Sequence, residues 1–77
     1  MIQATVAVYP LGAEGAVEAA IDAIARAGVD YDVRPMHTEL RGETDAVFAA
    51  VRAAWDVAAA RGGVVMTLTV SNACPLP

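Results

Sequence analysis

The period of the hydrophobic pattern restricts the fold of this 77-residue chain more than any single residue does. Segments in which apolar and polar side chains alternate are typical of strands with one buried face, and segments with apolar residues three or four positions apart are typical of amphipathic helices. The alternating segments are residues 2–9, 31–34, 37–41 and 64–71, and the helical segments are residues 14–27 and 44–60. The sequence therefore predicts the element order βαββαβ.

This order indicates an α+β fold, a ferredoxin-like sandwich in which two helices cover one face of a four-stranded antiparallel sheet. Gly28 is expected at the C′ position of the first helix, and Arg61-Gly62-Gly63 is expected to end the second. Thr44 and Asp45 are suited to capping and charging the start of that second helix. No linker or repeat interrupts the pattern, so residues 1–77 are predicted to form a single ferredoxin-like domain.

The predicted core is small. The hydrophobic fraction is 57%, but much of it is alanine, and a buried methyl group contributes only about 0.8 kcal/mol. A domain of this length buries roughly 60% of the surface that its unfolded chain exposes, so self-association would help to stabilise it. Phe48 and Trp55 lie on the apolar stripe of the second helix and are expected in the core.

The sheet is expected to leave one face uncovered by helices. We expect Thr5, Tyr9, Thr67 and Thr69 near its centre, and the side chains assigned to this face by parity are Gln3, Thr5, Ala7, Tyr9, Asp32, Arg34, His37, Glu39, Arg41, Val65, Thr67, Thr69 and Ser71. Such a face can be wetted by solvent, bind a second subunit or form the floor of a ligand site. The small core favours association.

Charge and cysteine content exclude several classes of protein. The net charge of −4, the pI near 4.6 and the lack of lysine argue against binding of nucleic acid. Cys74 is the single cysteine, so one chain can form neither a disulfide nor a cysteine-based metal site, and a reducing cytoplasm is the expected location. No apolar run approaches the ~20 residues of a membrane span, and the first residues resemble a strand and not a signal peptide.

The predicted strand at residues 37–41 carries the side chains best suited to acid–base chemistry or to hydrogen bonding with a ligand. His37 and Glu39 point to the same side, roughly 6–7 Å apart, and could form an acid–base pair. An exposed histidine among charged residues is more often a solvated surface residue, and no nucleophile is evidently placed beside it. Thr38 points to the helix-covered side with Leu40, where its hydroxyl needs a partner: a backbone group, the start of the second helix or a ligand.

Five segments together resemble the YkoF-type thiamine- and hydroxymethylpyrimidine-binding domain. In chain order they are Gln3 to Leu11, Pro35-Met36-His37-Thr38, Arg41-Gly42, Asp45-Ala46-Val47-Phe48 and Ser71-Asn72-Ala73-Cys74-Pro75. The resemblance covers nearly the whole chain and implies non-catalytic binding of thiamine or its pyrimidine precursor, with thiamine as ligand and not as cofactor. It also implies association through the sheet as a homodimer or higher homo-oligomer.

Carried over residue by residue, the resemblance implies that the ligand contacts Tyr9, Pro10, Thr38, Ser71, Asn72 and Cys74. Tyr9 or Glu39 would also suit the thiazolium cation of thiamine. Leu76-Pro77 replaces a glycine expected after Pro75. The function expected is therefore binding in thiamine salvage or transport. The alternative is an oligomeric interaction or regulatory module that binds another small molecule or none, and an enzyme using His37 and Glu39 is the least expected of the three.

Overall fold

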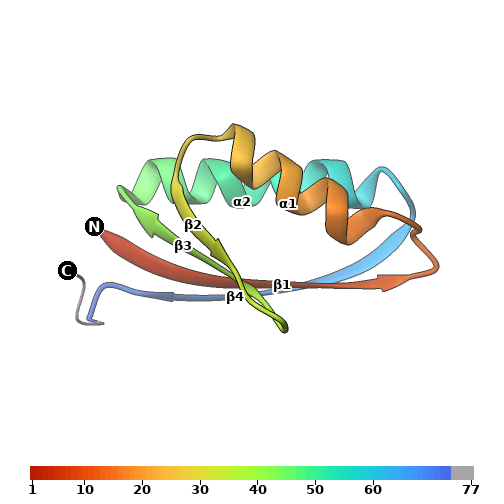
Figure 1. The fold of residues 1–77 in the computed structure, drawn as a ribbon, viewed down its shortest axis with the longest axis horizontal. Helices are drawn as coiled ribbons and strands as arrows, with labels where there is room; N and C mark the ends of the chain where they lie inside the picture. The colour runs from red at the N-terminus through yellow and green to blue at the C-terminus, as the bar shows by residue number, and fades with distance from the viewer. Residues whose placement is uncertain (74–77) are drawn as a thin grey trace.

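The computed structural model describes residues 1–73, which form two layers (Figure 1). The elements in chain order are β1 (Ile2–Leu11), α1 (Ala16–Arg26), β2 (Asp30–Val33), β3 (Thr38–Gly42), α2 (Thr44–Ala59) and β4 (Gly63–Ser71). The strands form one antiparallel sheet in the order β2-β3-β1-β4, and both helices cover the same face of it. This arrangement confirms the predicted α+β, ferredoxin-like sandwich.

The core lies between the sheet and the helices. Leu40, Val47 and Ile24 are its largest fully enclosed side chains, and alanines fill most of the remaining contacts. Ala50, Ala54 and several other small residues let the helices approach the sheet and each other closely. The hydrophobic layer between the helices and the sheet is therefore thin. The predicted alternation in β1 and β3 is confirmed for the covered face by the burial of Ile2, Ala4, Val6, Thr38 and Leu40.

The helix ends predicted from the sequence are confirmed only in part. Gly28 has a φ of 81° and directly follows the C-cap Ala27, as predicted. The N-cap of α2 is Glu43 without a side-chain hydrogen bond, so the prediction that Thr44 caps this helix is wrong. Thr44 is instead the first helical residue, and Asp45 lies in the first turn, where its negative charge interacts favourably with the helix dipole.

The prediction that Phe48 and Trp55 belong to the core is wrong. Both are exposed, by 45% and 41%. The positions of α2 that face the sheet are taken by Val47, Ala50, Val51, Ala54 and Ala58, all of them small or medium-sized. A helix turns 100° per residue, so Phe48 and Trp55 fall on a flank of α2 and not on its buried side.

The predicted position of β4 also needs correction. Thr67 and Thr69 were expected near the centre of the open face, but β4 is an edge strand, and the central strands are β1 and β3. Thr5 and Tyr9 do lie on a central strand, with Thr5 opposite Thr69 and Tyr9 opposite Val65.

Candidate functional site

The site begins with a difference in length between two neighbouring strands. β1 pairs with β4 from Gln3 to Leu11, but it pairs with β3 only as far as Val6, which lies opposite Thr38. Residues 34–37, which precede β3, do not continue this pairing. They form the turn between β2 and β3, which is closed by a hydrogen bond from the Arg34 amide to the His37 carbonyl oxygen. The second half of β1 therefore has no neighbouring strand on the β3 side, which leaves a step in the sheet.

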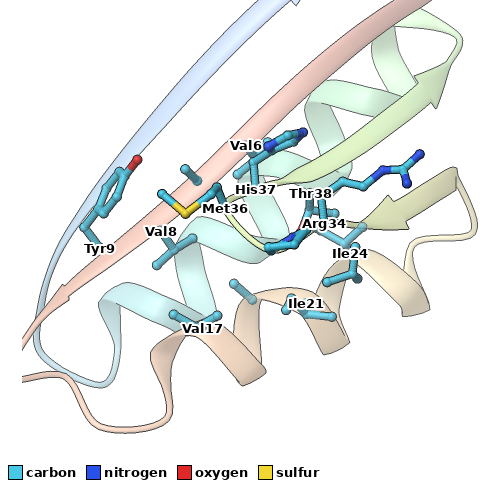
Figure 2. A pocket seen from close by; sticks show the side chains of 14 residues that line it. Val6, Val8, Tyr9, Val17, Ile21, Ile24, Arg34, Met36, His37 and Thr38 are labelled. Atoms are coloured by element: carbon cyan, nitrogen blue, oxygen red, sulfur yellow. The ribbon is translucent and has the colours of Figure 1, made fainter.

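A cavity of about 260 Å³ occupies this step, between β1, α1 and the turn (Figure 2). Val17, Ile21 and Ile24 of α1 form one side of it, and β1 and the turn form the other. Its lining is mainly apolar, and Arg34, His37, Thr38 and Tyr9 carry the polar side chains. Such a cavity suits a small, flat ligand with few polar groups.

Thr38 supplies the hydroxyl on the covered side of the sheet. The residue is only 6% exposed, and within residues 1–73 its hydroxyl makes no hydrogen bond. Among the same residues, no fully enclosed side-chain oxygen or nitrogen lacks a partner, so the Thr38 hydroxyl is not fully enclosed, and the residue lines the cavity. A hydroxyl in such surroundings is stabilised by a bound molecule that hydrogen-bonds to it.

Backbone groups of β1 add further donors and acceptors. In a strand, alternate residues direct both their N–H and C=O groups to the same edge. From Ala7 to Leu11 the β1 edge on the β3 side has no strand partner in the described part of the chain, and no other hydrogen bond there occupies it. This edge presents paired hydrogen-bond donors and acceptors next to the cavity.

A charged network lies at the rim, on the open face of the sheet. His37 Nε2 is 3.2 Å from Glu39 Oε2, and Arg34 lies 3.7 Å from the other carboxylate oxygen of Glu39. Arg41 donates hydrogen bonds to Asp30 at 3.0 Å and to Asp32 at 2.7 Å.

The hydrogen bonds to Asp30 and Asp32, in that order of importance, raise the pKa of Arg41 above its ordinary value. Glu39 is thus held between three cationic or ionisable side chains, those of Arg34, His37 and Arg41. Within residues 1–73 no group of three His, Cys, Asp or Glu side chains could hold a metal ion. The arrangement fixes Glu39 and His37 in place beside the cavity.

The structure brings together some of the residues proposed from sequence. Tyr9 and Thr38 both line the cavity, whereas Pro10 lies one residue beyond it and Glu39 lies on the open face. Ser71 pairs with Gln3, and Gln3 and Tyr9 are separated by roughly 20 Å of extended strand. Ser71 and Asn72 therefore lie at the opposite end of the sheet from the cavity, and Cys74 lies outside the described residues.

Many of the residues that line the cavity were not predicted from the sequence. Arg34 and Met36 of the turn line the cavity, as do Val17 and Ile21 of α1. The apolar stripe of α1 was recognised as a core face, and the pattern contains no signal that part of it borders empty space. Only the short pairing between β1 and β3 turns this part of the core face into a cavity wall.

Residues 4–72 match the model of a family described as thiamine-binding protein. The chain belongs to this thiamine-binding protein family. No curated protein matches the sequence significantly.

Solved structures share the fold of this family member. A domain of unknown function from Bacillus cereus is 25% identical with a TM-score of 0.82, covering 91% of this chain and 73% of that one. Protein SP2199 from Streptococcus pneumoniae is 21% identical with a TM-score of 0.85, covering 91% and 83%. A Thermotoga maritima protein named for thiamine biosynthesis or salvage is 22% identical with a TM-score of 0.78, covering 90% and 80%.

Proposed function

We propose that this member of the thiamine-binding protein family binds thiamine or its hydroxymethylpyrimidine moiety in the cavity, without converting it, in thiamine salvage or transport. The observation that carries the proposal is the Thr38 hydroxyl, which lines an apolar cavity and has no hydrogen-bond partner within residues 1–73. The family assignment and the thiamine-related name of the Thermotoga maritima protein support this choice of ligand.

The size of the cavity supports a ligand that is only partly enclosed. Cavities that bury drug-sized molecules measure about 300–1,000 Å³, and this one measures about 260 Å³. A single substituted pyrimidine ring suits this space, with its amino group and ring nitrogens turned to Thr38 and the β1 edge. The thiazolium ring of thiamine would then lie at the mouth, near the exposed Tyr9 ring, where a cation–π contact contributes about 0.5–1 kcal/mol.

Thermal unfolding with added hydroxymethylpyrimidine and, separately, thiamine tests this proposal directly. Ligand at ~100 times its dissociation constant stabilises the folded state by about 2.7 kcal/mol, which raises the Tm of a domain of this size by about 10 °C or more. The proposal is wrong if neither compound at millimolar concentration changes the Tm.

Thr38→Val removes the hydroxyl and keeps the shape of the side chain. We expect this variant to bind hydroxymethylpyrimidine about tenfold more weakly in a calorimetric titration, because one hydrogen bond to the ligand contributes about 1.5 kcal/mol. The free energy of unfolding without ligand should change little, because the hydroxyl has no hydrogen-bond partner in the described chain.

Thr5→Val is the matched control for Thr38→Val. Thr5 is in β1, opposite Glu39, and its side chain lies on the open face of the sheet, away from the cavity lining. The same chemical change should leave the dissociation constant of hydroxymethylpyrimidine unaltered. Equal effects of the two substitutions would place the ligand outside the cavity.

The second candidate function is an oligomeric interaction or regulatory module that uses the same scaffold and binds another small molecule or none. The observation in its favour is the amount of exposed apolar surface on α2 and β4. A homo-oligomer is compatible with both candidates, and we propose that state for the protein. Loss of ligand binding and loss of association are measured separately, so experiment can distinguish the two candidates.

A further inference from the structure

The pairing of the strands shows which main-chain groups of β1 point toward the cavity. In an antiparallel sheet, the N–H and C=O groups of one residue point to the same side of its strand, and the side alternates from each residue to the next. The Arg34 amide donates a hydrogen bond to the His37 carbonyl oxygen, so the main-chain groups of His37 point toward β2. Those of the next residue, Thr38, therefore point toward β1, where Thr38 lies opposite Val6.

The same alternation along β1 identifies the groups on its free edge. Since the main-chain groups of Val6 point toward β3, those of Ala7 point toward β4 and those of Val8 point to the β3 side again. Val8 is thus the first residue of β1 whose N–H and C=O groups point to the side that β3 has left. Pro10 agrees with this assignment, because proline has no N–H and its nitrogen in a sheet faces an unpaired side.

Val8 has lost the residue that would pair with it. The last pair between β1 and β3 joins Val6 to Thr38. Two residues further in this antiparallel register, Met36 would lie opposite Val8. Met36 instead belongs to the turn and is 77% exposed, and in the described part of the chain no main-chain hydrogen bond joins it to Val8. Both residues line the cavity, which therefore takes the place of the missing strand residue (Figure 2).

We propose that the N–H and C=O groups of Val8 select the ligand of this cavity, by pairing with a flat ring that carries an amino group next to a ring nitrogen. The Val8 N–H donates to the ring nitrogen, and the amino group donates to the Val8 carbonyl oxygen. The ring then pairs with β1 as the missing residue of β3 would. This assignment rests on the proposed function, and it adds which edge of the pyrimidine the protein recognises and which groups recognise it.

The surroundings of Val8 favour such selection. A neighbouring amide donor and acceptor match an amino group beside a ring nitrogen, as the amide side chains of Asn and Gln match adenine in DNA. Val17 and Ile21 of α1 make the opposite wall apolar, and a polar group left unpaired in apolar surroundings is costly. A ring without the amino group leaves the Val8 carbonyl oxygen unpaired. The Thr38 hydroxyl can rotate to donate or to accept, so it does not make this distinction by itself.

The free protein tests the orientation of Val8 without any ligand. Hydrogen exchange followed by NMR should be about tenfold or more faster at the Val8 amide than at the amides of Ala7 and Tyr9. These two residues lie in the same strand and their amides point toward β4, so they are the matched controls. Equal protection of the three amides would overturn the assignment.

Hydroxymethylpyrimidine with isotope-labelled ring nitrogens tests the contact itself. In the saturated protein we expect a scalar coupling across the hydrogen bond from the Val8 amide to a ring nitrogen, and none at Ala7 or Tyr9. The same compound without its amino group should bind about tenfold or more weakly in a calorimetric titration, because it loses the hydrogen bond to the Val8 carbonyl oxygen.

The outcomes separate this assignment from the proposed function. If hydroxymethylpyrimidine binds without the coupling at Val8, or if removal of the amino group leaves the affinity unaltered, the Val8 assignment is wrong and the proposed function stands. If hydroxymethylpyrimidine does not bind at all, the proposed function is wrong and the Val8 assignment is wrong with it.

Discussion

Leu40→Ala is expected to destabilise the folded protein by about 3 kcal/mol, the loss that replacement of a fully buried leucine typically causes. Leu40 is completely buried in β3, a central strand, and is among the three largest enclosed side chains of an interior otherwise rich in alanine. Small neighbours cannot extend into the space that the leucine leaves, so most of the cavity should persist. Urea denaturation should show a markedly lower midpoint with the slope unchanged.

Leu11→Ala provides the matched control, because Leu11 is 68% exposed at the end of β1. We expect this change to alter the free energy of unfolding by no more than about 0.5 kcal/mol. A domain of this size has a total stability on the order of 5–10 kcal/mol, so the two leucines should differ clearly in the Tm as well. A loss of less than about 1 kcal/mol on Leu40→Ala would contradict the packing described for the core.

Ala20→Leu should nearly abolish ligand binding while the fold remains intact. Ala20 is buried in α1, and its methyl group forms part of the cavity wall. A leucine there extends into the space proposed for the pyrimidine ring, so we expect the affinity for hydroxymethylpyrimidine to fall by about a hundredfold, or about 2.7 kcal/mol. Because the added atoms occupy existing space, stability without ligand should change little or rise. Calorimetric titration and thermal unfolding measure the two effects separately.

The same substitution three residues further along α1 is its control. Ala23 faces the surface hollow between α1 and α2 and does not line the cavity. Ala23→Leu should therefore bind hydroxymethylpyrimidine like the wild type. If Ala20→Leu retained wild-type affinity, the ligand would have to bind elsewhere on the protein.

The sequence predicted the fold because its signals are local. Period-2 and helical patterns report which side of each element is buried, and Gly28 marks a helix end through its backbone freedom alone. The placement of Thr38 on the covered side followed from parity in a single strand, and the structure confirms its burial. Each of these inferences depends on a few neighbouring residues.

The residues of the candidate site could be predicted from the sequence only in part. Tyr9 and Thr38 were proposed as ligand residues and both line the cavity, but Arg34, Met36 and Ile21 were not proposed. A cavity exists here because the shorter strand β3 pairs with the first half of β1 and its pairing ends at Val6 and Thr38. The alternation within one strand shows which of its sides is buried, but it does not show which residues of two strands lie opposite each other.

By itself the sequence determined the order of the elements, the buried side of the two central strands and the membership in a family of thiamine-binding proteins. Only the tertiary structure decided that β4 is an edge strand, that Phe48 and Trp55 are exposed and that Ser71 lies far from Tyr9. The physical reason is that periodicity reports direction around one element, whereas exposure and proximity depend on which elements pack on either side of it. Phe48 and Trp55 are apolar at helical spacing, yet α1 occupies one flank of α2 and no described element covers the other.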